Sequence, residues 1–237
     1  MYFIFRYIKL TFTFLRLHII FNWLSLAFLN GYYLTKFSLW VSKNKKIAYN
    51  DFPSKYDYLK RYPFYKWVLE REGLSSLPVN YMEFGVANGT SFRWFLQQNN
   101  NEDSNFYGFD TFTGLPEDFG LYKKGYFNNQ NAPPEVNDSR AKFYQGLFQQ
   151  TLPGFVTKWN KEKRNILMLD ADLYSATMYV LATLAPHLKK GDVIFFDEFS
   201  VPTQEFKAYQ DFVKSFHLPM ELIAAANNYY FVAFKVG

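Results

Sequence analysis

The sequence predicts an α/β fold with a mostly parallel sheet, closed at its C-terminal end by an antiparallel hairpin. From residue 79 to residue 198, short apolar runs end in an acid or a glycine and alternate with helical or loop stretches, which is typical of a parallel sheet. Residues 221–226 and 229–236 then form two strand-like runs separated only by two asparagines, which tolerate the positive φ of a tight turn. The chain has 237 residues, of which 49% are apolar, enough to bury a substantial core.

Four apolar runs in the central region are predicted to be strands that end in acids. Runs such as 166–169 and 193–196 are apolar without alternation, as expected for strands covered on both faces. Ligands of open α/β sheets bind beyond the carboxyl ends of the strands, so we expect the terminal acids to line one rim. The strands are 79–85, 106–110, 165–170 and 193–198, with a further candidate at 141–146, and the acids are Glu83, Asp110, Asp170 and Asp197.

Helices are predicted between these strands, at residues 90–98, 175–188 and 203–216. The run Lys189-Lys190-Gly191 suits the C-terminus of the second helix, because basic side chains complement the helix dipole and glycine adopts the left-handed cap. The stretch 119–138 is too long for a simple connector and is predicted to form a loop on the substrate side. Three of its aromatic residues, Tyr122, Tyr126 and Phe127, are expected either to stack on a sugar or to pack within the loop.

The charge of the chain is unevenly distributed. The formal net charge is +5, but residues 1–50 contain seven basic residues and no acid, whereas residues 51–237 contain 19 basic and 21 acidic residues. The larger part therefore has no excess of positive charge with which to track a phosphate backbone, and no nucleic-acid partner is expected. The shift in composition predicts two parts, a helical segment over 1–50 and the main domain over 51–237.

Residues 1–41 have the apolar and aromatic composition of a segment that contacts a membrane. Nineteen uncharged residues separate Arg16 from Lys36, close to the ~20 that span a bilayer, but polar residues interrupt them. Arg6, Lys9 and Arg16 would share one helix face beside apolar neighbours, which is typical of a basic helix lying in the membrane interface. The alternative is that these helices pack on the main domain as a lid or form a contact between two copies. The chain is expected to be cytoplasmic, at the inner face of the membrane if this segment touches lipid.

The absence of cysteine excludes several classes of protein. A disulfide scaffold, a zinc ribbon, an iron–sulfur protein and a cysteine nucleophile all need thiols.

The first predicted strand leads into a turn with the features of a nucleotide site. Gly85 and Gly89 allow a ligand to approach the backbone closely, and Thr90 or Ser91 begins the next helix. The acid before the first glycine, Glu83, suits a cationic cofactor that carries an amino acid better than it suits a pyrophosphate. Further along the chain, Asp110 is placed to accept hydrogen bonds from both ribose hydroxyls of an adenosine, and Gly146 and Leu147 are placed to flank the adenine.

Four acids follow the last two parallel strands, and carboxylates of this kind suit Mg²⁺. They are Asp170, Asp172, Asp197 and Glu198. The alternative is that one or two of them cap helices or pair with arginine or lysine.

Four ordered motifs lie at the ends of the predicted strands. Together they resemble the macrocin O-methyltransferase-like family of S-adenosylmethionine (SAM)-dependent, metal-assisted sugar methyltransferases, over residues 80–236. The motifs are Met82-Glu83-Phe84-Gly85-Val86 with Gly89-Thr90-Ser91, Tyr107-Gly108-Phe109-Asp110-Thr111-Phe112 with Gly114-Leu115-Pro116-Glu117, Leu169-Asp170-Ala171-Asp172-Leu173-Tyr174-Ser175, and Phe196-Asp197-Glu198-Phe199.

The resemblance implies a Rossmann-like class I methyltransferase fold that transfers a methyl group to a hydroxyl of a sugar or glycoconjugate. It implies SAM at Glu83, Gly85 and Asp110. It also implies that Mg²⁺, or another divalent cation, activates the acceptor hydroxyl while Asp172 takes the proton. The implied metal ligands are Asp170, Asp197 and Glu198, where related members often carry Asp-Asp at the last two positions.

Two other functions compete with this interpretation. Asp170-Ala171-Asp172 is formally a DxD motif, which could hold a metal and a nucleotide diphosphate in a glycosyltransferase. The second alternative is a non-catalytic, membrane-attached module that keeps the fold for assembly. The glycine turn, the ribose acid and the C-terminal hairpin argue against the glycosyltransferase, and the presence of every acid at its expected position argues against the non-catalytic module.

Overall fold

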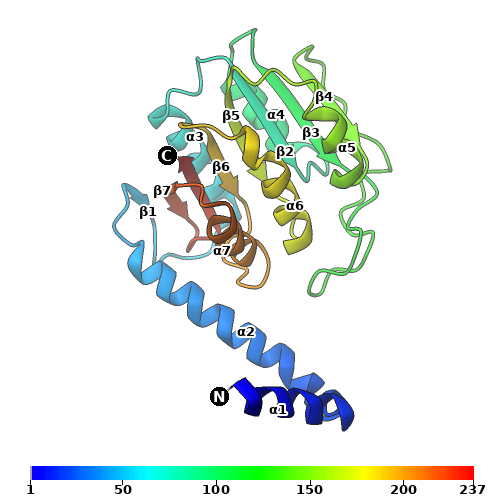
Figure 1. The fold of residues 1–237 in the computed structure, drawn as a ribbon. Helices are drawn as coiled ribbons and strands as arrows, with labels where there is room; N and C mark the ends of the chain where they lie inside the picture. The colour runs from blue at the N-terminus through cyan, green and yellow to red at the C-terminus, as the bar shows by residue number, and fades with distance from the viewer. Residues whose placement is uncertain (1) are drawn as a thin grey trace.

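The computed structural model describes residues 2–237 as one eight-stranded sheet with helices on both faces (Figure 1). The strand order is β1-β7-β8-β6-β5-β2-β3-β4, and β8 alone runs antiparallel to its two neighbours, β6 and β7. The predicted sheet with a C-terminal hairpin is therefore confirmed. The strands are β1 (Tyr49–Asn50), β2 (Val79–Phe84), β3 (Asn105–Asp110), β4 (Ala141–Gln145), β5 (Arg164–Leu169), β6 (Val193–Phe196), β7 (Met220–Ala226) and β8 (Phe231–Val236).

The turn between β7 and β8 is longer than the two residues predicted. Asn227, Asn228 and Tyr229 all have positive φ, at 53°, 60° and 63°, and Phe231 is the first residue of β8. Contacts from outside the hairpin stabilise this turn. Asn227 and Asn228 accept hydrogen bonds from the backbone N–H groups of Asp57 and Ser54, in the segment that follows β1. In addition, Asn50 Nδ2 donates to the Tyr229 hydroxyl at 2.8 Å, and that hydroxyl donates to the Asn44 carbonyl at 3.2 Å.

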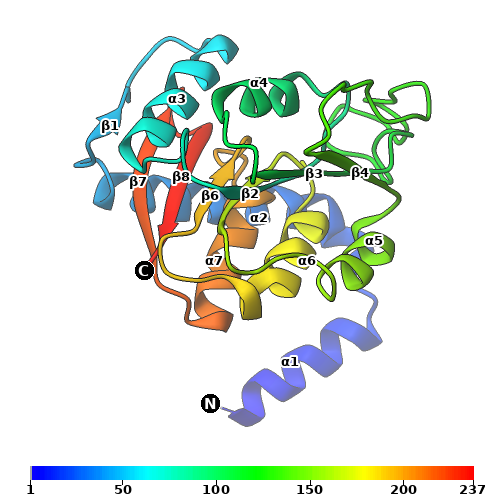
Figure 2. The same ribbon diagram turned by 90° about the horizontal axis from the view of Figure 1, so that it is seen from above.

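Two layers of helices cover the sheet, as Figure 2 shows. Helices α3 (Arg61–Arg71) and α4 (Thr90–Gln98) pack on one face, with buried side chains that include Phe64, Tyr65 and Phe95. Helices α5 (Phe148–Phe155), α6 (Tyr174–Leu184) and α7 (Glu205–Phe216) pack on the other. The central parallel strands β2, β5 and β6 are buried on both faces, which explains their continuous apolar character.

The predicted helices are present with shifted ends. Residues 90–98 form α4 with the predicted bounds, and α7 begins two residues later than predicted. Helix α6 stops at Leu184, where a 3₁₀ turn at Ala185–His187 takes over because Pro186 cannot continue an α-helix. The predicted cap at Gly191 is therefore wrong; this residue, with φ of 93°, lies in the turn that enters β6.

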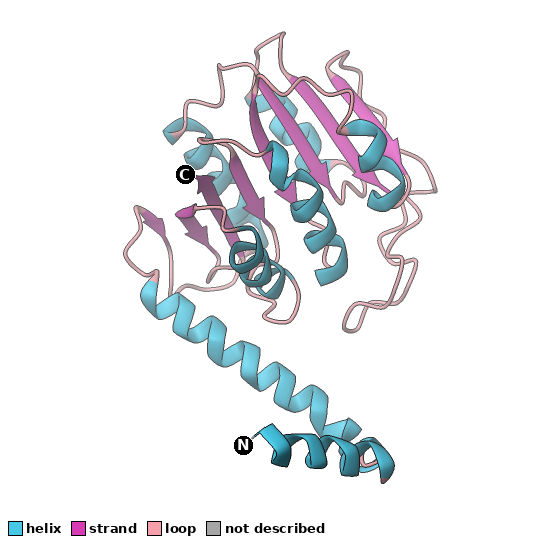
Figure 3. Cartoon of the chain, viewed as in Figure 1, coloured by secondary structure: helices cyan, strands magenta, loops and turns pink. Residues whose placement is uncertain are grey.

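The N-terminal helices α1 (Tyr2–Phe14) and α2 (His18–Lys43) project from the domain (Figures 1 and 3). Only the last turns of α2 pack on it: the rings of Phe37 and Phe206 are 5.1 Å apart, and those of Trp40 and Phe199 are 5.0 Å apart. No single helix within residues 2–237 is long and apolar enough to cross a bilayer; α1 and α2 meet that test only together, and they are bent by 115°.

Candidate active site

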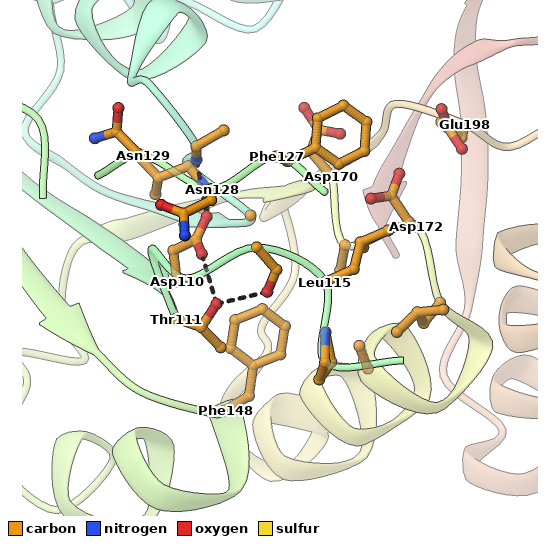
Figure 4. Close-up of a pocket in the computed structure, with 18 of the residues that line it drawn as sticks. Asp110, Thr111, Leu115, Phe127, Asn128, Asn129, Phe148, Asp170, Asp172 and Glu198 are labelled. Carbon is orange, nitrogen blue, oxygen red and sulfur yellow. Dashed lines mark hydrogen bonds between the residues drawn. The ribbon is translucent and has the colours of Figure 1, made fainter. Parts of the chain in front are cut away.

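A cavity of about 710 Å³ lies at the carboxyl ends of β2, β3 and β5, where the sequence predicted a ligand site (Figure 4). Its walls come from the turn after β2, the ends of β3 and β5, the start of α5 and part of the loop over 119–138. This volume falls within the range of pockets that enclose a small-molecule ligand.

Gly85 is required at the end of β2 by the neighbouring strand. Its φ is 94°, and a Cβ at this position would lie 1.7 Å from the carbonyl oxygen of Asp170. Both Gly85 and Asp170 line the cavity. Gly89 also has positive φ, but the residue that a Cβ would meet is Pro134, at 2.8 Å, and Gly89 does not line the cavity.

Asp110 fixes the shape of the glycine turn and lines the cavity. Its Oδ2 accepts hydrogen bonds from the backbone N–H groups of Val86 and Ala87, each at 2.8 Å, and its Oδ1 accepts one from Phe112 at 2.7 Å. The carboxylate therefore ties the turn after β2 to the end of β3. Figure 4 shows it on the cavity wall, beside Thr111.

The residues expected at the adenine position lie on the cavity wall, together with an aromatic ring that the sequence analysis missed. Gly146 and Leu147 line the cavity, as does Phe148 at the start of α5. The Phe148 ring packs edge-on against Phe84, with ring centroids 5.5 Å apart. The helical spacing of Phe148, Leu152 and Phe155 could have revealed α5.

Glu83 lies beneath the cavity rather than on its wall, which corrects the expectation of direct contact with a cofactor. Its side chain is fully buried and accepts hydrogen bonds from Ser91 Oγ at 2.6 Å and from the Tyr81 hydroxyl. Burial raises the pKa of Glu83 to about 7, although both hydrogen bonds oppose the shift. Ser91 and Thr90 do line the cavity, and Glu83 holds Ser91 in place there through the hydrogen bond from its hydroxyl.

Asp197 is also beneath the surface, where three side chains hold it. Arg61 Nη2 donates to Asp197 Oδ1 at 2.9 Å, and the hydroxyls of Tyr65 and Tyr58 donate at 2.6 and 3.2 Å. The same Arg61 nitrogen lies 3.4 Å from Asp170 Oδ2. The Arg61 guanidinium therefore lies between Asp170, which follows β5, and Asp197, which follows β6.

Asp172 and Glu198 form a second acidic pair, which faces the cavity (Figure 4). Burial, followed by the charge of the neighbouring Glu198, raises the pKa of Asp172 to about 8. Glu198 Oε1 accepts a hydrogen bond from the Tyr230 hydroxyl at 2.5 Å. Asp172 has a φ of 58°, a strained conformation for a residue other than glycine, of the kind that clusters at functional sites.

Comparison with known proteins identifies the domain around this cavity. A methyltransferase domain family matches residues 82–199, from the end of β2 to just beyond β6. Residues 82–199 are a methyltransferase domain. The family match establishes SAM as the cofactor class, as predicted, and it favours the methyltransferase over the glycosyltransferase alternative. No curated protein sequence matches the chain.

Solved structures place the methyltransferase domain within a known fold. The calicheamicin methyltransferase CalS11 is 23% identical, with 75% of this chain and 79% of that chain covered and a TM-score of 0.60. The O-methyltransferase NovP is 22% identical, with 74% and 79% covered and a TM-score of 0.58. The predicted class I methyltransferase fold is thus confirmed.

The methyltransferase domain does not assemble the predicted metal ligands, Asp170, Asp197 and Glu198. Within residues 2–237, no three histidine, aspartate or glutamate side chains are placed to hold a metal ion. Asp197 is occupied by Arg61 and two tyrosines, and Glu198 faces Asp172 instead. As arranged here the residues do not fit a divalent cation. The alternative that arginine pairs with some of these acids describes Asp170 and Asp197 correctly.

Only part of the loop over 119–138 reaches the cavity of the methyltransferase domain. Phe127, Asn128 and Asn129 line it, and the Asn129 N–H donates to the Phe112 carbonyl at 3.1 Å. Tyr122 and Tyr126 do not line it; they pack on each other with ring centroids 4.6 Å apart. Of the three aromatic residues considered for sugar stacking, Phe127 is therefore the one in place.

Three residues before the first predicted strand also line the cavity, and the sequence analysis missed them. Tyr58, Arg61 and Tyr62 come from the 3₁₀ turn Tyr58–Lys60 and the start of α3. The sequence did contain a signal for this helix: Asp57 is a residue type that caps helices, and apolar residues recur at helical spacing from Phe64 onward. In the structure the Asp57 side chain accepts a hydrogen bond from the Leu59 N–H.

Proposed function

We propose that this methyltransferase domain transfers the methyl group of SAM to a hydroxyl of a sugar or glycoconjugate. The observation that carries the proposal is one cavity with two chemically different ends, Asp110 and Phe148 at one and the Asp172–Glu198 pair at the other. The first end suits an adenosine, and the second suits a group that loses a proton. A structure titled apo CalS11, a TDP-rhamnose 3'-O-methyltransferase, is similar in fold, at 22% identity and a TM-score of 0.53.

The reaction in this site is an in-line displacement on the methyl carbon of SAM. A bond forms between the acceptor oxygen and the methyl carbon as the bond from that carbon to sulfur breaks, which releases S-adenosylhomocysteine. The acceptor proton moves to the Asp172–Glu198 pair. A neutral hydroxyl is a poor nucleophile, so a carboxylate that removes this proton during the transfer contributes typically 10²–10⁴-fold to the rate.

The protonation state of the acidic pair suits this role. With a pKa of about 8, Asp172 is largely protonated at neutral pH while the cavity is empty, and once ionised it is a stronger base than an ordinary aspartate. The positive sulfonium of SAM in the same cavity favours the ionised form of the pair, because an opposite charge lowers a carboxyl pKa. Binding of the cofactor therefore prepares the base, while the hydrogen bond from Tyr230 keeps Glu198 oriented.

Arg61 pairs with two of the acids that the resemblance assigned to a metal, Asp170 and Asp197. The guanidinium remains charged at any relevant pH and lies between Asp170 and Asp197, whose charges would otherwise repel each other. Because Arg61 already pairs with these acids, the acceptor proton is assigned to the Asp172–Glu198 pair without a metal ion.

Calorimetric titration of S-adenosylhomocysteine into the full chain tests the cofactor end. Asp110→Asn is the test variant, since it weakens the ribose acceptor and the support of the glycine turn; Asp118→Asn, an exposed acid on the loop, is the matched control. We expect micromolar binding that falls at least tenfold in the first variant alone. A glycan screen with methyl-labelled SAM then tests the acceptor. A folded chain that binds no S-adenosylhomocysteine would contradict the proposal.

A further inference from the structure

Helix α1 and the first half of α2 present an apolar surface that the domain does not cover. Nineteen of the thirty large apolar side chains exposed within the described residues belong to positions 3–39. The exposed fraction is 73% for Trp23, 72% for Phe28 and 75% for Phe3. Such a patch is far larger than the isolated apolar residues of an ordinary protein surface, and it marks an interaction site.

The charge on this surface identifies its partner. Arg6, Lys9 and Arg16 are exposed among the apolar side chains of α1 and the turn that follows it, and residues 1–50 carry no acid to balance them. A second copy of the chain would bring the same positive charges together. An anionic lipid surface instead complements both the basic and the apolar side chains.

The shape of the two helices fits the plane of a bilayer surface. Two straight helices that meet at a bend define a plane, so both can lie in the same interface despite their 115° angle. Aromatic residues such as Trp23 and Tyr32, both exposed, prefer the level of the lipid headgroups. Phe37 and Trp40, in the last turns of α2, then attach the domain to these two helices.

The orientation of the domain agrees with α1 and α2 lying on a membrane surface. In Figures 1 and 3 the arrowheads of the parallel strands point to the same side of the molecule on which α1 lies. The cavity opens at these carboxyl ends. We propose that residues 3–34 form an interfacial anchor for anionic membranes, which holds the cavity on the side of the domain that faces lipid.

Sedimentation of the full chain with vesicles tests the anchor. The probes are vesicles of neutral phosphatidylcholine and vesicles that contain 30% phosphatidylglycerol. We expect binding to the anionic vesicles that weakens as salt rises. The combined variant Arg6→Gln, Lys9→Gln and Arg16→Gln should weaken it on the order of 100-fold, because about 1 kcal/mol for each basic residue corresponds to about fivefold.

The matched control removes the same charge from the domain, with Lys66→Gln, Lys158→Gln and Lys161→Gln, and should bind as the wild type does. A second pair of variants separates apolar burial from charge: Trp23→Ser should weaken binding to both kinds of vesicle, whereas Leu121→Ser, on the exposed loop, should not.

Two results would overturn the inference. One is equal binding of the basic-residue variant and its control to anionic vesicles. The other is a stable dimer in light scattering that dissociates on Trp23→Ser, with no vesicle binding by the wild type. Because these readouts do not involve SAM, their failure is distinguishable from failure of the proposed methyl transfer.

Discussion

Replacing Arg61 by methionine tests whether its guanidinium neutralises the acids beneath the cavity. The side chains of Arg61 and Asp197 are only 7% and 1% exposed and lie 2.9 Å apart, so the variant leaves a buried carboxylate without its positive partner. Removing one member of a buried ion pair costs about 3–5 kcal/mol. For a chain of this size that free energy corresponds to a fall in Tm of roughly 10 °C.

Thermal unfolding followed by circular dichroism measures this change. Lys66→Met is the matched control, because Lys66 lies on the same helix with 63% of its side chain exposed and should shift the free energy of unfolding by less than about 0.5 kcal/mol. Adding Asp197→Asn to Arg61→Met removes the unpaired charge and should recover much of the loss. A single variant that unfolds within about 1 °C of the wild type would refute the reasoning.

The same assay addresses the metal. If Arg61 is the resident cation, the Tm of the wild type should be the same in Mg²⁺ and in a chelator. In Arg61→Met, the freed carboxylates of Asp170 and Asp197 should give Mg²⁺ a measurable stabilising effect. A wild-type Tm that rises with Mg²⁺ would instead restore the metal site predicted from the sequence.

Three further predictions concern the cavity. Asp172→Asn should lower kcat by about 10²–10⁴-fold while the affinity for S-adenosylhomocysteine is unchanged; a smaller loss of kcat would assign the proton to another group. Gly85→Ala should cost at least about 3 kcal/mol in urea unfolding, because its Cβ would lie 1.7 Å from the Asp170 oxygen, whereas Gly31→Ala, with no atom within 4 Å, should not destabilise the chain. The pKa of Glu83 is raised from 4.5 to about 7 on folding, so its contribution to stability is full below pH 4.5 and is lost as the pH rises to 7. As the pH rises over this range, the free energy of unfolding of Glu83→Gln should therefore increase by about 3 kcal/mol relative to that of the wild type. If the two proteins show the same dependence of unfolding free energy on pH, the carboxyl does not titrate.

The sequence predicted most of the sheet because its central strands are buried on both faces. Continuous apolar runs such as 166–169 and 193–196 leave few alternatives to a parallel sheet, and glycines and acids punctuate their ends. Short elements were missed for the opposite reason. The two-residue β1 exists only through its pairing with Ala224 and Ala225, which lie far away in the sequence, and no local pattern encodes that contact.

The site was predicted in outline, but the depth of each acid was not. All four strand-end acids were expected at one rim, yet Glu83 and Asp197 lie below the cavity while Asp110 and Asp170 line it. How deeply each acid is buried depends on which side chains from elsewhere in the chain cover the end of its strand. Arg61 reaches Asp197 across 136 positions of sequence, so the pairing that removes it from metal binding is decided by tertiary packing.

The turn between β7 and β8 connects the C-terminal end of α2 to the acidic pair at the cavity. The Tyr229 hydroxyl is held by Asn50 and by the Asn44 carbonyl, at the junction where α2 meets the domain. The next residue, Tyr230, donates to Glu198. If α2 tilted when the proposed anchor binds a membrane, Tyr229 and Tyr230 would therefore carry that movement to Glu198.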